Sequence, residues 1–362
     1  MVKHEGLVTR IASGCDDRGI ANLRATMRSK QHIYPFARVH FTPHFSTDAK
    51  TGKDYKFYNK PHGILHWLTH GEGAAEVGVI ALIDPDQVFL RPLTVWVANE
   101  TNVLVTGPVK IKDLPLRVSP GLPVAQFYGL GDKWIQFNRE YICGAGSPCI
   151  DVDSKDAWRY YTVGPPYVLH VEDWKKVAES WVDFVPKVYE EYPNLLAEMY
   201  AYCLAAAHHE LPHARVDHLM VSNVGAYGEG WSFVDQMASV CDPGIPLRWT
   251  PAAQLPTFLH FCQSYSVRGS RFGNWRFGKR SVSKDLFTNC DAKPLPRPPS
   301  NASLLQPEAS QIMVTSREKP KLNKDEKVIR DVKRNAFMVC TATSYVNEAM
   351  LRHKAEFCQT GG

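Results

Sequence analysis

The sequence of 362 residues lacks any apolar run that approaches the length of a membrane span. Its first residues, Met1 to Gly6, also lack the apolar segment of a secretory signal peptide. Two interpretations follow: either the protein is soluble, or its targeting segment is missing from this chain.

Cysteine pairs of the CxxC type are absent although the chain contains nine cysteines, which disfavours a structural zinc finger. Cys143 and Cys149 bracket a flexible loop of glycine, serine and proline, and a disulfide between them would close it. Asn99 and Asn301 begin N-glycosylation sequons, which matter only in the secretory lumen. Together with the nine cysteines, these sequons favour a lumenal compartment.

A long basic stripe with interleaved aromatic residues is missing from the first 290 residues, and Lys plus Arg exceed Asp plus Glu by only 42 to 37. Nucleic acid is therefore excluded as a main partner. No internal repeat is present. The composition, 44% hydrophobic and 22% charged, predicts one large or two modest globular domains with a sizeable core.

What the sequence does contain is a pair of carboxylates at the end of an apolar run. Asp84-Pro85-Asp86 directly follows Val77 to Ile83, a segment that predicts a buried strand. Two carboxylates two residues apart can hold one hard divalent cation with oxygen ligands while open positions remain for a phosphate-bearing substrate. The alternative is a surface turn, because Asp and Pro both favour turns.

The segments around this pair alternate between helix and strand. Asn59 is predicted to cap a helix that starts at Lys60-Pro61, and the strand at Val77 to Ile83 follows it. This alternation predicts an α/β domain with a parallel sheet. Apolar residues at helical spacing predict two further helices, from Glu172 to about Tyr189 and from Asn194 to about His209.

Composition divides the chain into three parts. Residues 1–292 form the main domain, residues 293–320 a proline-rich linker, and residues 321–362 a charged helical segment that we expect to fold back on the main domain. The charge run from Arg317 to Arg334 is expected to be a solvated helix face.

A competing metal motif occurs near the middle of the chain. His209-Glu210-Leu211-Pro212-His213 formally matches the H-E-x-x-H pattern of zinc proteases, which needs both imidazoles one helical turn apart on the same face. Pro212 lies inside this turn and breaks the helix, so the two histidines are not expected to share a face. A helix C-terminus where His208 and His209 meet the helix dipole is the simpler interpretation, and a zinc protease is a distant third hypothesis for the function.

Five segments of the chain, in order, resemble one family of glycosyltransferases. They are Tyr58–Pro61 with His66–Leu68, Ile80–Leu93, Val163–Tyr167, Glu198–Tyr202 and Phe258–Tyr265. In order and spacing they resemble the plant and algal hydroxyproline O-arabinosyltransferases and peptidyl serine α-galactosyltransferases, over roughly residues 7–292. The resemblance implies a GT-A-like α/β fold with a mixed, mostly parallel sheet flanked by helices.

The same resemblance implies a chemistry. It suggests a metal-dependent, retaining glycosyltransferase that moves a sugar from a UDP-sugar to a hydroxyl of hydroxyproline or serine in a protein acceptor. The implied cofactor is Mn²⁺ or Mg²⁺. The implied location is the Golgi or endoplasmic reticulum lumen, with attachment to the membrane only through a type II anchor that is absent from this chain.

Carried onto this chain, the resemblance assigns Asp84 and Asp86 as ligands of a cation that bridges the diphosphate, and His260 as the histidine that completes the metal shell. The alternative for His260 is a histidine at a strand end without a ligand role. Asn59 and Lys60, in the first matching segment, are assigned to the donor pocket.

Negative charge develops on the leaving nucleoside diphosphate, and Lys279 or Arg280 could neutralise it together with the metal ion. Glu198 is the candidate for positioning the acceptor hydroxyl or stabilising the oxocarbenium-like centre. The alternatives are ordinary surface cations and a helix-surface glutamate. Aromatic residues that could stack on the uridine or the sugar are Trp231, Tyr265 and Trp275.

Two departures from the family pattern support a rival hypothesis. The acidic motif resembles Glu-Pro-Asp in the hydroxyproline-specific members and Asp-Ala-Asp in the serine-specific ones, whereas this chain has Asp84-Pro85-Asp86, so neither sugar nor acceptor can be carried over. Only about six residues precede the strand expected at Leu7 to Ala12, so we expect the domain to lack its first strand. The rival is a catalytically impaired glycosyltransferase-like binding protein.

Overall fold

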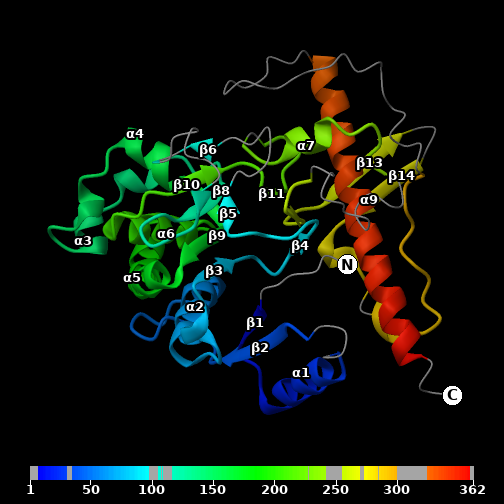
Figure 1. Ribbon diagram of the computed structural model, residues 1–362, viewed down its shortest axis with the longest axis horizontal. Coiled ribbons are helices and arrows are strands. Elements are labelled where there is room, and N and C mark those ends of the chain that lie inside the picture. The colour runs from blue at the N-terminus through cyan, green and yellow to red at the C-terminus, as the bar shows by residue number, and fades with distance from the viewer. Residues whose placement is uncertain are drawn as a thin grey trace.

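The computed structural model describes residues 7–30, 35–97, 105–106, 108, 116–226, 228–241, 255–269, 273–283, 285–299 and 324–358. These residues form an N-terminal βαβ unit, a central sheet with two long helices, and a second half built around the C-terminal helix (Figure 1). The sequons at Asn99 and Asn301 and most of the linker at residues 293–320 lie outside the described residues.

The N-terminal unit consists of two parallel strands joined by a helix. Strands β1 (Val8–Ser13) and β2 (Ala37–Thr42) pair in parallel, and α1 (Asp17–Lys30) connects them. They form a sheet of their own, which lies against α2 (Asn59–His70) in the blue part of Figure 1. The sequence predicted β1 but neither α1 nor β2.

The central sheet has the strand order β3-β9-β8-β10-β6. Its strands are β3 (Val79–Leu82), β6 (Val105–Thr106), β8 (Val124–Phe127), β9 (Val163–His170) and β10 (Ala214–Val216). Three of its four pairings are antiparallel, and only β8 and β10 are parallel neighbours. The predicted mostly parallel sheet is therefore wrong, because β9 inserts between β3 and β8 and runs against both.

Two antiparallel helices, α5 (Val171–Glu191) and α6 (Ala197–His208), cover one face of this sheet. Along α5 the buried residues recur at helical spacing, whereas α6 is rich in alanine and buried on nearly all sides. Tyr167 of β9 stacks on Tyr202 of α6 with 3.8 Å between ring centroids, which fastens the helix layer to the sheet. Both helices were predicted from the sequence.

The second half of the molecule centres on α9 (Lys324–Phe357), the long orange and red helix of Figure 1. It packs on the hairpin of β13 (Tyr265–Gly269) and β14 (Gly273–Phe277) and on α7 (Trp231–Asp235). A three-stranded sheet of order β11-β12-β4 connects this half to the centre. Its strands are β4 (Gln87–Phe89), β11 (Met220–Val221) and β12 (Phe258–His260).

Short elements complete the described structure. The strands β5 (Trp96–Val97) and β7 (Leu116–Arg117) pair with each other, and the short α-helices are α3 (Arg139–Cys143), α4 (Ser154–Asp156) and α8 (Asp285–Thr288). Tighter or wider helical turns span Lys56–Tyr58, Ala74–Glu76, Lys133–Gln136, Pro148–Ile150, Ala157–Tyr161 and Lys279–Ser281. None of the described helices is both long enough and apolar enough to cross a membrane.

Three disulfides connect six of the described cysteines, and Cys15, Cys203 and Cys262 are free. The bond between Cys143 and Cys149, which the sequence offered as one way to close their loop, is present. Two further bonds, Cys241–Cys340 and Cys290–Cys358, tie α9 to the rest of the chain and were not predicted, because connectivity between distant cysteines cannot be read from sequence.

The Cys241–Cys340 disulfide is expected to stabilise the fold more than the local Cys143–Cys149 disulfide. Loop-closure entropy predicts a loss of about 4–5 kcal/mol on replacing Cys241 and Cys340 by alanine, against about 2 kcal/mol for Cys143 and Cys149, because the closed loops span sequence separations of 99 and 6. Denaturant unfolding of the two double variants measures both losses. An equal or larger loss for the local pair would contradict this dependence of the stabilisation on loop length.

Candidate metal and donor site

Asp84 and Asp86 lie in the turn that carries the chain from β3 to β4. The Gln87 backbone N–H donates to the Asp84 carbonyl oxygen at 3.0 Å, and the Gln87 side-chain oxygen accepts from the Asp84 backbone N–H at 2.9 Å. The same side chain donates its amide N–H to the Pro165 carbonyl oxygen at 3.3 Å. Gln87 is buried, so these bonds fix the turn against the central sheet.

His260 reaches this turn through the pairing of β12 with β4. The two strands run antiparallel, with His260 opposite Gln87, and the Phe261 N–H donates to the Asp86 carbonyl oxygen at 3.1 Å. The Tyr265 hydroxyl donates to the His260 carbonyl oxygen at 3.0 Å. Hydrogen bonds at the His260 carbonyl and at the next N–H therefore fix the main chain that carries the imidazole.

In each of the two aspartates, one carboxylate oxygen pairs with a lysine and the other lies near His260. Asp84 Oδ2 and Asp86 Oδ1 lie 4.0 and 3.2 Å from His260 Nε2. The other oxygens pair with lysines: Asp84 Oδ1 with Lys60 Nζ at 2.9 Å, and Asp86 Oδ2 with Lys279 Nζ. Two oxygens and one imidazole nitrogen, all within 4.8 Å of one another, thus face a common point.

This donor set fits a hard divalent cation. Carboxylate oxygens are the preferred ligands of Mg²⁺, and an imidazole nitrogen beside them suits Mn²⁺ as well. Burial disfavours the ionised form of Asp86, but hydrogen bonds from His260 and Lys279 outweigh it and lower the pKa of Asp86 below its usual range. The structure thus brings together the three predicted metal ligands, and metal binding itself stays a prediction.

Lys60 joins the acidic turn to the buried carboxylate of Glu198. Its Nζ lies 2.9 Å from Asp84 Oδ1 and 2.9 Å from Glu198 Oε1. Burial lowers the pKa of Lys60, but the two carboxylates more than offset it, so the pKa is raised and the ammonium stays charged. Burial raises the pKa of Glu198, and Lys60 acts in the opposite sense.

Glu198 is fixed by its main chain as well as by its carboxylate. Its N–H donates to the Tyr55 hydroxyl oxygen at 3.1 Å, and its carbonyl accepts from the Trp181 indole N–H at 2.8 Å. The side chain is only 3% exposed, so the alternative of a helix-surface glutamate is wrong. Glu198 lies in the first turn of α6 and reaches the acidic turn through Lys60.

Asn59 does not cap α2, which begins at Asn59 itself, with Tyr58 at the N-cap. Its side-chain oxygen accepts from the Phe45 N–H at 3.0 Å, and its amide donates to Ser46 Oγ at 2.6 Å and the Lys56 carbonyl at 2.9 Å. The cap prediction is wrong because the side-chain oxygen, the atom that a cap would use, accepts from Phe45 in the loop after β2 instead. Asn59 therefore holds that loop against the start of α2.

The remaining predicted residues do not join the acidic turn. Arg280 is exposed and forms no ion pair with a described residue. Trp231 and Tyr265 are both 1% exposed, so their rings are not accessible to a nucleotide and the predicted stacking role is wrong for these two residues. Trp275 is partly buried against the core around α9.

The supporting roles of three residues were missed by the sequence analysis, although Tyr265 was named there as a stacking candidate. Gln87 orders the acidic turn, Tyr55 contacts the main chain of Glu198, and Tyr265 supports His260. Only Gln87 gave a signal, since a polar residue next to the apolar run Val88-Phe89-Leu90 suggests a buried hydrogen-bonding role. The other two act through tertiary contacts that no local pattern reveals.

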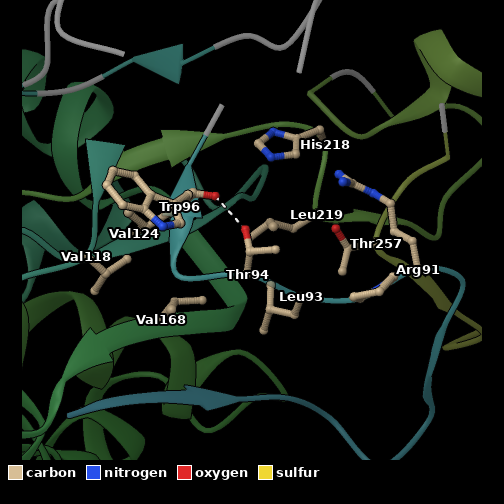
Figure 2. Close-up of a pocket in the computed structure, with 11 residues that line it drawn as sticks. Arg91, Leu93, Thr94, Trp96, Val118, Val124, Val168, His218, Leu219 and Thr257 are labelled. Carbon is tan, nitrogen blue, oxygen red and sulfur yellow. Dashed lines mark hydrogen bonds between the residues drawn. The ribbon is translucent and has the colours of Figure 1, made fainter. Parts of the chain in front are cut away.

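A separate pocket lies on the other face of β9 (Figure 2). Tyr167 faces α6, whereas its neighbour Val168 lines this pocket. None of the predicted site residues lines it. Its lining residues are Arg91, Pro92, Leu93, Thr94, Trp96, Val118, Val124, Val168, His218, Leu219 and Thr257.

The H-E-x-x-H histidines point to different partners. α6 ends at His208, and Glu210 has a positive φ of 53°. His209 Nε2 contacts Ser180 Oγ at 2.8 Å, whereas His213 is fully buried and its Nε2 contacts the Tyr202 hydroxyl at 2.8 Å. The two imidazoles do not converge, as the sequence argument from Pro212 expected.

Lys60→Met is expected to destabilise the fold far more than Lys279→Met. Removing Lys60 leaves the Glu198 carboxylate buried without its counter-charge, a loss of about 3–5 kcal/mol in the free energy of unfolding. Lys279 is 42% exposed, and its loss is expected to cost about 1 kcal/mol or less. Urea unfolding of both variants measures these losses. The double variant Lys60→Met/Glu198→Gln should regain part of the stability lost in Lys60→Met, because it no longer buries an unpaired carboxylate. Equal losses would contradict the assigned role of Lys60.

His213 is expected to make stability depend on pH. Burial lowers the pKa of His213 from 6.5 to about 3. Below pH 6.5 the unfolded chain binds a proton that the folded chain does not, so stability falls as the pH falls toward 3. Between pH 7.5 and 5 the wild type is expected to lose about 2 kcal/mol more than His213→Gln in urea unfolding. Parallel losses in both proteins would refute this assignment.

Comparison with curated proteins finds similarity to the peptidyl serine alpha-galactosyltransferase of Arabidopsis thaliana, 24% identical over 317 residues. The match covers 83% of this chain and 31% of the relative, so the chain spans about a third of the relative's length. No family model and no solved structure matches. Over most of its length the chain is thus similar to this galactosyltransferase, and the family resemblance drawn from its five ordered segments is confirmed.

Proposed function

We propose that the chain is a glycosyltransferase that moves a sugar from a UDP-sugar donor to a serine hydroxyl of a protein acceptor, with a divalent cation bound by Asp84, Asp86 and His260. One observation carries the proposal. Asp84 and Asp86 each place one carboxylate oxygen close to the His260 imidazole, so that three ligand atoms lie close together. The similarity to a peptidyl serine galactosyltransferase supports the reaction class.

The proposed cofactor is Mn²⁺ or Mg²⁺, which when bound would hold the diphosphate oxygens and offset the charge of the leaving group. Lys279 is half-exposed beside Asp86, where its ammonium can contact the departing diphosphate. Lys60 stays charged and orients Asp84. The burial of Glu198 favours a positioning role, through Lys60, over the direct contact with the acceptor that the sequence suggested.

Serine is the proposed acceptor because the relative is named for serine. No comparison supports the hydroxyproline alternative. A GT-A-like fold and retention of the anomeric configuration remain part of the proposal, and the mixed α/β architecture is compatible with them. Three disulfides favour an oxidising compartment such as the Golgi or endoplasmic reticulum lumen.

The rival function, a catalytically impaired binding protein, is supported by one observation. Lys60 and Lys279 already pair with both aspartates, so much of the negative charge at the site is balanced without a metal ion. A cation must therefore compete with, or bind beside, two ammonium groups. Measurement of metal-dependent turnover separates the two functions.

Asp86→Asn is expected to abolish metal-dependent turnover of the donor. The wild type should hydrolyse or transfer from UDP-galactose in the presence of Mn²⁺. The variant should lose about 100-fold or more of this activity, because a neutral amide replaces the negative charge of the carboxylate. Asp156→Asn, an exposed aspartate on α4, is the matched control and should retain activity. If the wild type neither binds nor turns over UDP-sugars with Mn²⁺, the rival function is favoured.

A further inference from the structure

A cluster of histidines lies between α2 and β2, away from the acidic turn. His62, His66 and His70 follow one another at four-residue intervals, so they lie along one side of α2. β2 places His40 across from His66. This cluster takes no part in the proposed glycosyl transfer.

Two of these imidazoles are in direct contact. His40 Nε2 lies 2.8 Å from His66 Nδ1, and the two ring centroids are 5.0 Å apart. The ring of His70 follows one helical turn later, with its centroid 4.7 Å from that of His66. His40 and His66 are half-buried and His70 is exposed, so the cluster is open to solvent on one side.

The His40–His66 contact is close to the geometry of two metal ligands. Zinc binds imidazole nitrogens at about 2.0–2.1 Å in a tetrahedron, which separates two such nitrogens by about 3.3 Å. The observed 2.8 Å is a hydrogen-bond separation, so one ring donates its N–H to the other. For both nitrogens to ligate the ion, the separation must open by about half an ångström and the donating ring must carry its proton on its other nitrogen. Among the described residues only Asp84, Asp86 and His260 already present three converging ligand atoms, so His70 must turn its exposed ring to supply the third nitrogen.

The protonation state also suits a metal. Burial, together with the neighbouring histidines, lowers the pKa of His40 and of His66. These shifts favour the neutral ring, the form that ligates metals, over the imidazolium. His66 and His70 have the four-residue helical spacing with which pairs of histidines bind zinc.

We propose that His40, His66 and His70 form a binding site for a borderline transition-metal ion, with Zn²⁺ as the type. Imidazole ligands suit Zn²⁺, Co²⁺ and Ni²⁺, whereas the carboxylates of the acidic turn suit Mg²⁺ and Mn²⁺. The bound ion would connect β2 to α2 and so fasten the N-terminal βαβ unit to the rest of the protein. Its chemistry is independent of the proposed transferase reaction.

Titration of the full chain with Zn²⁺ tests the site, in an Asp86→Asn background that weakens the acidic turn as a competitor. This protein should bind one Zn²⁺ by calorimetry, should show the visible absorption of tetrahedral Co²⁺ with Co²⁺, and should unfold at a higher temperature with Zn²⁺. Adding His70→Ala, an exposed substitution that should not disturb folding, or His66→Ala should weaken binding by about 100-fold or more.

His62→Ala is the matched control. His62 lies on the same side of α2, but its ring stacks on Phe45 at 4.8 Å, so its loss should leave Zn²⁺ affinity within about twofold. Equal Zn²⁺ affinity with and without His70 and His66 would overturn the proposal, as would the absence of Zn²⁺ binding in the Asp86→Asn protein. Loss of binding in the His62 variant alone would overturn the assigned ligand set.

Discussion

The antiparallel pairing of β4 with β12 is the interaction on which the arrangement of this protein depends. β4 leaves the acidic turn at the edge of the central sheet, and β12 belongs to the half of the molecule built around α9. Their ladder joins the two halves and also carries His260 to the aspartates. The Tyr345 hydroxyl of α9 donates to the Phe89 carbonyl oxygen at 2.9 Å and so braces the same strand from behind. A change that weakens this ladder would therefore separate His260 from Asp84 and Asp86 as well as the two halves.

Charge balance is the second constraint on the site. Three carboxylates, on Asp84, Asp86 and Glu198, meet two ammonium groups, on Lys60 and Lys279. The buried part of this network, around Lys60, is costly to break. Its charges have lost contact with water, and removing one partner leaves another charge buried without compensation. The more exposed part, around Lys279, can rearrange at small cost. The network thus combines a rigid side that faces the core with an adaptable side that faces solvent.

Local patterns in the sequence predicted local structure well. The spacing of apolar residues identified α5 and α6, and the position of Asp84 after an apolar run identified the acidic turn. What failed depended on contacts between distant segments. The insertion of β9 between β3 and β8, the capture of the Asn59 side chain by the preceding loop and the two disulfides to α9 leave no periodic trace in the chain. His260 was found only because its segment resembles a known family, since nothing local distinguishes it from a histidine at the end of any strand.

The two disulfides that attach α9 determine whether the protein stays in one piece after its backbone is cut. Cys290 bonds to Cys358 and Cys241 bonds to Cys340, so each disulfide joins a residue before the start of α9 to a residue within or just after that helix. If a protease cut any single peptide bond between Cys290 and Cys340, the two resulting polypeptides would remain one molecule until a reductant was added. Under oxidising conditions such a nicked protein would have the mass of the intact chain plus one water, because the disulfides keep both fragments together. The attachment of α9 after cleavage thus depends on where the sulfur atoms are joined rather than on an unbroken backbone.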